Sequence, residues 1–175
     1  MNRIKLFLSL VGISVLVLSA LFLAGCGKKL VTSAYVDEKN KVSVALSYPD
    51  DSKYSYSTEE EDLHTSAEEA ILTADSYKIA WDIVSVGYSG DFESVKQKAM
   101  EKDEAKEVEY NGIKGVSYYY SPYVRYTVAL PINDKCYIEF HIYSTDEQHD
   151  KNHVDEVFAK DEVQNILKTV DIKQS

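Results

Sequence analysis

Two histidines stand four residues apart in an acidic stretch of the chain, a spacing that can bind a metal ion. On a helix, His149 and His153 would share one face, and the neighbouring acids Asp146 and Asp150 could complete the coordination. The alternative is a solvated connection whose acids stabilise the N-terminus of a helix that starts near Val154. We favour this alternative because a His-x-x-x-His pair without further ligand spacing has little specificity, and we expect no metal or other cofactor.

Nucleophilic chemistry has two candidate positions, and neither fits. Cys136 alternates with Ile138, Phe140 and Ile142, so we expect its thiol to point into the core as a small hydrophobic group. A catalytic thiol needs an exposed, electropositive setting instead. The segment 87–90, Gly-Tyr-Ser-Gly, is one residue shorter than a nucleophile elbow and fits better as a loop before a helix. We therefore expect no catalytic residue and no enzyme activity.

One strand carries residue types that are typical of interaction surfaces. If the apolar positions of 124–130 face the core, Tyr123 and Arg125 face the other way, and Arg125 is the only arginine after residue 25. Tyr119 lies on the preceding strand, close across the turn at Ser121-Pro122. Arginine with aromatic side chains suits a binding hot spot, which makes Tyr119, Tyr123 and Arg125 a candidate partner-binding face. The alternative is a tyrosine-rich strand pair covered by a helix, with Arg125 neutralised by a nearby acid, and the high strand propensity of tyrosine favours it.

The overall charge argues against nucleic acid as a partner. The formal net charge is −10, and it becomes −12 when Arg3 and Lys5 of the first 25 residues are left out. Such an acidic surface repels phosphate backbones. The two cysteines, Cys26 and Cys136, do not make a disulfide framework if Cys26 carries a lipid, so the fold must rest on its hydrophobic core.

The N-terminal segment has the organisation of an export signal. Arg3 and Lys5 precede the apolar run 6–23, and Ala24 and Gly25 are the small residues expected near a cleavage site. The tetrapeptide Leu23-Ala24-Gly25-Cys26 resembles the lipobox of bacterial lipoproteins, in which the cysteine thiol is diacylated and cleavage leaves that cysteine at the N-terminus. The resemblance implies a signal peptide over 1–25, a lipid on Cys26, and a location on the extracytoplasmic face of the cell membrane. An uncleaved membrane helix is the alternative, because the apolar run is near the length that spans a bilayer.

Residues 26–40 are expected to form the lipid anchor and a tether, although 31–36 could add a first strand, and 41–173 are expected to form a single globular domain. Alternation predicts a strand over 42–48. The acidic stretch 50–75 is expected to be mostly solvated loop, with a short helix from Ser66 through Leu72 because Ser66 and Glu69 have capping-box spacing. A strand over 77–88 changes its apolar parity, which suggests a bulge near Ile83–Val84.

The second half of the chain has clearer signals for its helices, strands and turns. Asp91 can cap a short helix, and Asn111-Gly112 predicts a type I′ hairpin between strands 106–110 and 113–120. Strands over 124–130 and 136–143 follow, and a helix after Asp161 ends the chain. This order predicts an α+β domain, an antiparallel sheet with helices packed against it.

The motif Val108-x-Tyr110-Asn111-Gly112-x-x-Gly115 and the C-terminal pattern Phe158-x-x-Asp161-Glu162-Val163-Gln164-x-Ile166-Leu167 resemble the PsbP-like superfamily, which includes the DcrB-type bacterial lipoproteins. The resemblance covers roughly 40–173. It implies an antiparallel sheet sandwiched by helices, a PsbP-like α/β/α sandwich, and a role as a binding or assembly factor without a common catalytic centre. It carries no functional residue over to this chain.

The sequence therefore predicts a non-enzymatic, membrane-anchored extracytoplasmic lipoprotein that acts as a binding or accessory domain at the cell envelope. The expected partners are the membrane, through the lipid on Cys26, and a protein or peptide. Two alternatives stay open: an envelope hydrolase or metal-dependent enzyme, and a structural spacer.

Overall fold

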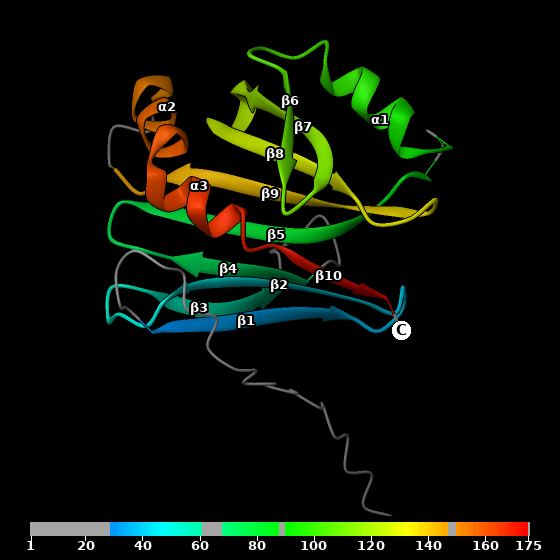
Figure 1. Cartoon of the computed structure of the whole chain (residues 1–175). Coiled ribbons are helices and arrows are strands. Elements are labelled where there is room, and N and C mark those ends of the chain that lie inside the picture. The colour runs from blue at the N-terminus through cyan, green and yellow to red at the C-terminus, as the bar shows by residue number, and fades with distance from the viewer. Residues whose placement is uncertain (1–28, 61–67, 88–89, 147–149, 175) are drawn as a thin grey trace, which may run out of the picture.

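The computed structural model describes residues 29–60, 68–87, 90–146 and 150–174, and these residues form a mixed α+β fold (Figure 1). Within them lie two antiparallel sheets: a three-stranded sheet with the order β1-β2-β10, and a seven-stranded sheet with the order β3-β4-β5-β9-β8-β7-β6. The elements are β1 (Leu30–Asp37), β2 (Val42–Pro49), β3 (Ser55–Glu60), β4 (Glu68–Thr73), β5 (Tyr77–Ser85), α1 (Phe92–Ala99), β6 (Lys106–Tyr110), β7 (Ile113–Tyr120), a 3-10 turn (Ser121–Tyr123), β8 (Arg125–Pro131), β9 (Cys136–Ser144), α2 (Lys151–Ala159), α3 (Asp161–Leu167) and β10 (Asp171–Gln174). The predicted α+β class is confirmed.

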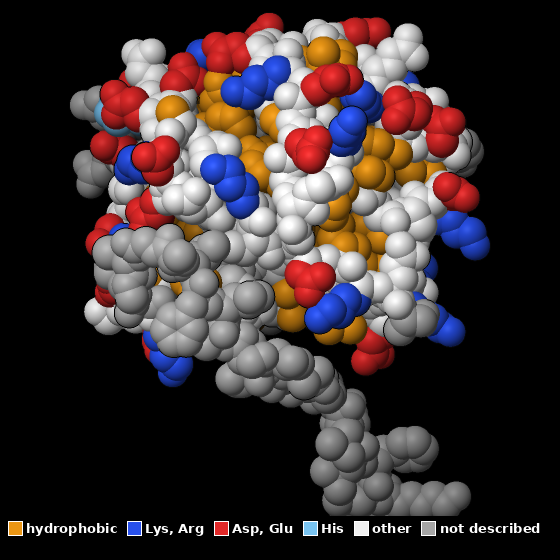
Figure 2. Space-filling view, in the orientation of Figure 1, with side chains coloured by type: hydrophobic (Ala, Val, Ile, Leu, Met, Phe, Trp, Pro, Cys, Tyr) orange, Lys and Arg blue, Asp and Glu red, His pale blue; other side chains and the backbone are white. Residues whose placement is uncertain are grey.

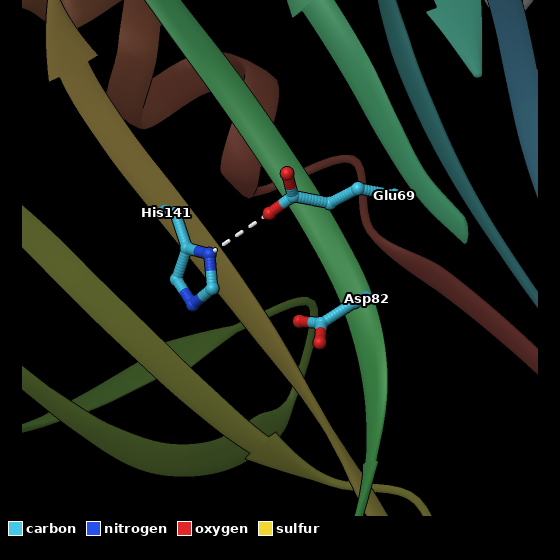
Figure 3. Close-up of side chains that lie close together, drawn as sticks. All are labelled: Glu69, Asp82 and His141. Carbon is cyan, nitrogen blue, oxygen red and sulfur yellow. Dashed lines mark hydrogen bonds and ion pairs between the residues drawn. The ribbon is translucent and has the colours of Figure 1, made fainter. Parts of the chain in front are cut away.

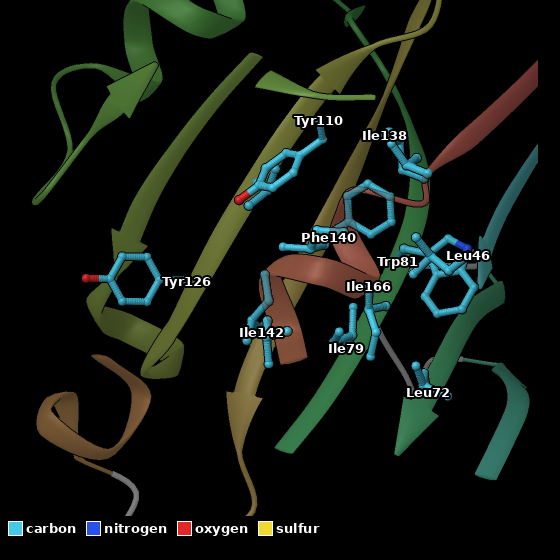
Figure 4. Packing of buried hydrophobic residues seen from close by; sticks show 14 of the residues in the cluster. Leu46, Leu72, Ile79, Trp81, Tyr110, Tyr126, Ile138, Phe140, Ile142 and Ile166 are labelled. Atoms are coloured by element: carbon cyan, nitrogen blue, oxygen red, sulfur yellow. The ribbon is translucent and has the colours of Figure 1, made fainter. Parts of the chain in front are cut away.

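One face of the seven-stranded sheet forms the main core. Side chains alternate along a strand, so Ile138, Phe140 and Ile142 of β9 all point to this face and are fully buried. The small sheet contributes Val44 and Leu46, and α2 and α3 cover the rest, as the packing in Figure 4 shows for Ile166. The sequence pattern predicts that Cys136, Ile138, Phe140 and Ile142 share one buried face of β9, and the structure confirms this.

The opposite face, which we call the outer face, has a smaller core under α1. Phe92 and Ala99 of α1 pack against Val116, Ala129 and Tyr137. This second core explains the change of apolar parity in β5, because the last apolar residues of that strand pack toward α1. The register runs without a break from Tyr77↔Ser144 to Ser85↔Cys136, so the predicted bulge near Ile83–Val84 is wrong.

Local signals in the sequence identify several element ends. Asn111 and Gly112 have φ values of 49° and 78°, as a type I′ turn requires. The Asp91 carboxylate accepts a hydrogen bond of 2.8 Å from the Ser94 backbone N–H and caps α1. The predicted hairpin and the predicted start of this helix are both confirmed.

The acidic stretch 50–75 differs from its prediction, because it contains the antiparallel pair β3 and β4 instead of a loop and a helix. Ala70 and Leu72 of β4 reach the main core, and Tyr56 of β3 packs its ring 5.8 Å from that of Trp81. Burial of these alternating side chains outweighs the local capping signal at Ser66 and Glu69. The helix predicted over 66–72 is therefore wrong.

The folded part also begins earlier and ends later than predicted. β1 pairs with β2 from Leu30↔Pro49 to Asp37↔Val42, so the first strand considered over 31–36 is confirmed and the predicted tether 26–40 largely belongs to the small sheet. β10 pairs with the other edge of β2. Its four residues are too few for alternation to predict a strand.

Acidic and basic side chains are interspersed over the face shown in Figure 2.

Candidate ligand-binding face of the large sheet

Beside the patch under α1, the outer face carries polar and aromatic side chains from five adjacent strands. We call this set the polar–aromatic face, and its members are Glu69 (β4), Lys78 and Asp82 (β5), Glu139, His141 and Tyr143 (β9), Arg125 and Thr127 (β8), and Tyr118 and Tyr120 (β7). Strand register places them side by side, since His141 lies opposite Thr127 and Glu139 lies opposite Asp82. The sheet thus gathers residues that are far apart in the sequence.

His141 lies between two carboxylates at the centre of this face. Its Nδ1 is 3.1 Å from Oε1 of Glu69, its Nε2 is 3.1 Å from Oε2 of Glu139, and its side chain is only 7% exposed. Burial lowers the pKa of His141, but the hydrogen bonds with Glu139 and Glu69 outweigh it and raise the pKa above its ordinary value. As an imidazolium, His141 donates a hydrogen bond to a carboxylate on each side.

Asp82 completes this group from the neighbouring strand. One nitrogen or oxygen atom each from Glu69, Asp82 and His141 lie within 4.8 Å of one another, and the three side chains point toward one another in Figure 3. Burial raises the pKa of Asp82 to about 6; the charges of Glu139 and Glu69 add to this effect and that of His141 opposes it. Oδ1 of Asp82 is buried and finds no hydrogen-bond partner among the described residues. Two carboxylates and an imidazole in this arrangement are a set of potential metal ligands.

Arg125 lies among tyrosines next to this group. Its guanidinium donates a hydrogen bond of 2.6 Å to the Tyr143 hydroxyl. The guanidinium carbon is 5.5 Å from the ring centre of Tyr120, 5.2 Å from that of Tyr123 and 5.7 Å from that of Tyr143. These are cation–π distances. Tyr123 is 64% exposed, so this group of three rings around Arg125 is open to solvent on the side of Tyr123.

The predicted partner-binding residues are brought together only in part. Tyr123 and Arg125 are in contact, as the pattern predicted. Tyr119 is misassigned: it faces the main core, is 8% exposed, and packs edge-on against Tyr126 at 5.8 Å. The reason is strand alternation, which puts Tyr118 and Tyr120 on the side of Arg125. Tyr120 therefore takes the place given to Tyr119.

The other candidate chemistry from the sequence is placed differently. His153 binds the Asp150 carboxylate at 2.8 Å through Nδ1, while the His153 backbone N–H donates to the same carboxylate, which caps α2. This is the capping role expected of the acids; His149, the other weak metal candidate, lies outside the described residues. Cys136 is buried as predicted, and burial raises the pKa of its thiol. Cys26 also lies outside the described residues.

Sequence reasoning missed four residues of this face: Glu69, Asp82, Glu139 and His141. The sequence holds one usable signal, because Glu139 and His141 are two residues apart on a strand whose alternate residues are apolar. Glu69 gives no such signal, because the capping-box spacing around it predicts a helix instead of a strand. The chain has 29 acids, too many to identify a functional pair from sequence alone.

Comparisons with known proteins give no further guidance. No protein-family model matches the chain, nor does any curated protein or solved structure. No helix in the described ranges is long and apolar enough to cross a membrane. Any functional assignment therefore rests on the residues and geometry of this chain.

Proposed function

We propose that this chain is a lipoprotein anchored through Cys26 on the extracytoplasmic face of the cell membrane, and that its domain binds a protein or peptide through the polar–aromatic face. The observation that carries the binding role is the position of Arg125, held among Tyr120, Tyr123 and Tyr143 beside an exposed ring. Arginine within aromatic rings is typical of interface hot spots.

The proposed anchor would hold the domain close to the bilayer. Only three residues separate Cys26 from Leu30, where β1 begins. Four extended steps span at most about 14 Å. Lys28 and Lys29 fall in this short connection and are suited to contact lipid head groups. The partner of such a domain would be another component of the envelope surface, within reach of the membrane.

The chemistry of the face favours a ligand that presents a carboxylate or backbone carbonyl groups. The Arg125 guanidinium is planar and offers a fork of donors, and its Nε is buried without a hydrogen-bond partner among the described residues. Tyrosine rings next to it can pack against the apolar part of a peptide while their hydroxyls stay hydrogen-bonded. An acidic peptide segment satisfies both features.

We also infer that the fold belongs to the PsbP-like superfamily as an α/β/α sandwich. The support is the hairpin at Asn111-Gly112, the C-terminal helix pattern, and helices on both faces of the large sheet. An experimental structure that superposes α1, α3 and the seven-stranded sheet on a superfamily member would agree with this inference. A different strand order in that comparison would contradict it.

The binding role is tested by purifying the tagged lipoprotein from its own membranes after mild cross-linking, with Arg125→Ala and Arg125→Lys compared. We expect Arg125→Ala to reduce the recovered partner at least tenfold, and Arg125→Lys to have an intermediate effect because it keeps the charge but loses the fork. The matched control is Lys114→Ala, which removes an exposed cation from β7. If Arg125→Ala unfolds the domain, Tyr123→Ala removes the exposed ring that borders Arg125 on this face without touching buried structure.

Two outcomes would contradict the binding role. Equal recovery of the partner with Arg125→Ala and Tyr123→Ala would show that the polar–aromatic face is not used. Recovery of no partner with the unmodified lipoprotein would support a structural spacer instead.

A further inference from the structure

Three side chains on neighbouring strands point to one spot of the polar–aromatic face. Glu69, Asp82 and His141 each bring one potential ligand atom, and these atoms lie within 4.8 Å of one another (Figure 3). We propose that these three residues bind a divalent transition-metal ion of the Zn²⁺ type. This site needs neither the lipid anchor nor the partner proposed above, so it can be tested separately.

The spacing of the best-placed pair suits such an ion. His141 Nδ1 and Glu69 Oε1 are 3.1 Å apart. Bonds of about 2.0–2.2 Å in a tetrahedral zinc site set two ligand atoms about 3.3 Å apart. An ion bound to the Nδ1 lone pair would take the place of the proton, and the Glu69 carboxylate would turn aside to bind the ion from its flank. Asp82 would approach from β5 by a rotation of its carboxylate.

The donor set selects among divalent cations. One imidazole nitrogen with two carboxylate oxygens suits Zn²⁺ and related transition metals. Ca²⁺ takes six to eight oxygen ligands and Mg²⁺ prefers an octahedron of oxygens, so this group of three offers both ions too little. Three protein ligands leave the fourth position of a tetrahedral ion for water or for a ligand group.

Glu139 would act as a positioning residue behind His141. Its Oε2 lies 3.1 Å from His141 Nε2, on the side of the ring away from Glu69. A histidine that binds a metal usually donates its other N–H to a carboxylate, which fixes both the tautomer and the ring orientation. With Nε2–H held by Glu139, loss of the Nδ1 proton would leave the lone pair of Nδ1 facing Glu69 for an ion to bind.

Asp82 supplies a second observation that points to a ligand at this spot. Its Oδ1 is buried and finds no hydrogen-bond partner among the described residues. Burying a carboxylate oxygen without a partner is costly. A bound divalent cation would give Oδ1 of Asp82 a partner.

The test is calorimetric titration of the full-length protein in detergent with ZnCl₂, after removal of metals with a chelator. We expect one ion per chain and a dissociation constant of about 1 µM or lower. His141→Gln and Glu69→Gln should each weaken binding at least tenfold. Glu139→Gln should weaken it about 10–100-fold through loss of the second hydrogen bond on His141. Absorption spectra of the Co²⁺ form should change for Glu69→Gln, which reports on the ligand set directly.

The matched control is His153→Gln, because His153 belongs to the rival metal pattern and lies at the start of α2. This variant should bind Zn²⁺ like the unmodified protein. Loss of binding in His153→Gln with retention in His141→Gln would overturn the proposal and assign the ion to the other histidines. Failure of the unmodified protein to bind Zn²⁺ tighter than about 100 µM would also overturn it, and would mean that His141 is a structural ion-pair partner of two acids. If His141→Gln unfolds, Glu69→Gln decides the question, since its side chain is partly exposed.

Discussion

Gly115 of β7 lies directly against the backbone carbonyl of Ala129 on β8, with no space for a side chain between them. A Cβ at position 115 would overlap the Ala129 oxygen and would lie 2.6 Å from Cδ2 of Leu130. The two strands are neighbours in the large sheet, where Val116 lies opposite Ala129. The glycine in the motif after the Asn111-Gly112 turn is therefore required by the close approach of two backbones.

We expect Gly115→Ala to lower the free energy of unfolding by about 2–3 kcal/mol, because the new methyl group must push β7 away from β8. Chemical denaturation followed by circular dichroism measures this loss. Lys114→Ala, a change at the neighbouring exposed position, should stay within about 0.5 kcal/mol of the unmodified protein. A Gly115→Ala variant as stable as Lys114→Ala would show that the strands separate here without cost.

The main core gives a second prediction, at Phe140. This side chain is fully buried, and its ring centre is 6.3 Å from that of Trp81. Phe140→Ala leaves a cavity in the main core beside Trp81, so we expect the free energy of unfolding to fall by about 3–5 kcal/mol. Val36→Ala, on a side chain that is 51% exposed, is the control and should cost less than about 1 kcal/mol. A loss below about 1 kcal/mol for Phe140→Ala would mean that β9 turns its other face to the core.

The predicted features share a physical basis, which is that each depends on a short stretch of sequence. Alternation along β9 identifies its buried face because a strand has a period of two. Asn111-Gly112 predicts its turn because both residues tolerate positive φ, and Asp91 predicts the start of α1 because its carboxylate caps a free N–H. None of these signals requires knowledge of which strand lies next to which.

The features that the sequence did not reveal depend on partners far away in the chain. The capping-box spacing of Ser66 and Glu69 runs into β4, and only the pairing of β4 with β3 and β5 decides against a helix. The short distance across the Ser121-Pro122 turn suggests Tyr119 as a neighbour of Arg125, but alternation along β7 points Tyr119 into the main core. Glu69 and His141 are 72 residues apart, and only the strand order brings them together.

The proposed anchor gives a third prediction, at Cys26. Cys26→Ser removes the thiol that would carry the lipid, so the protein should no longer be processed by the lipoprotein peptidase and should lose its diacyl group. Mass spectrometry of the N-terminus measures both changes. Cys136→Ser is the matched control and should leave the lipid in place. A mature chain that starts elsewhere, or an unmodified thiol at Cys26, would contradict the anchor.

A fourth prediction concerns the dependence of stability on pH through Glu162 at the start of α3. Lys53 Nζ lies 2.6 Å from Glu162 Oε1, and the Tyr54 hydroxyl donates to the same oxygen. Burial raises the pKa of Glu162, but these hydrogen bonds outweigh it and hold the pKa below the ordinary value of 4.5. A folded pKa below the unfolded one stabilises the domain above the unfolded value, and this contribution is lost as the pH falls through the folded pKa.

Glu162→Gln should therefore destabilise the domain by about 0.5–1 kcal/mol near neutral pH, a small value because solvent screens a group that is one-third exposed. The difference from the unmodified protein should shrink as the pH falls below about 4.5, where Glu162 becomes protonated. Urea denaturation at a series of pH values measures it. Glu101→Gln removes the same charge at an exposed site away from Lys53 and is the control. A difference that stays constant down to about pH 3 would show that the ionised carboxylate contributes nothing and that only the shape of the side chain matters.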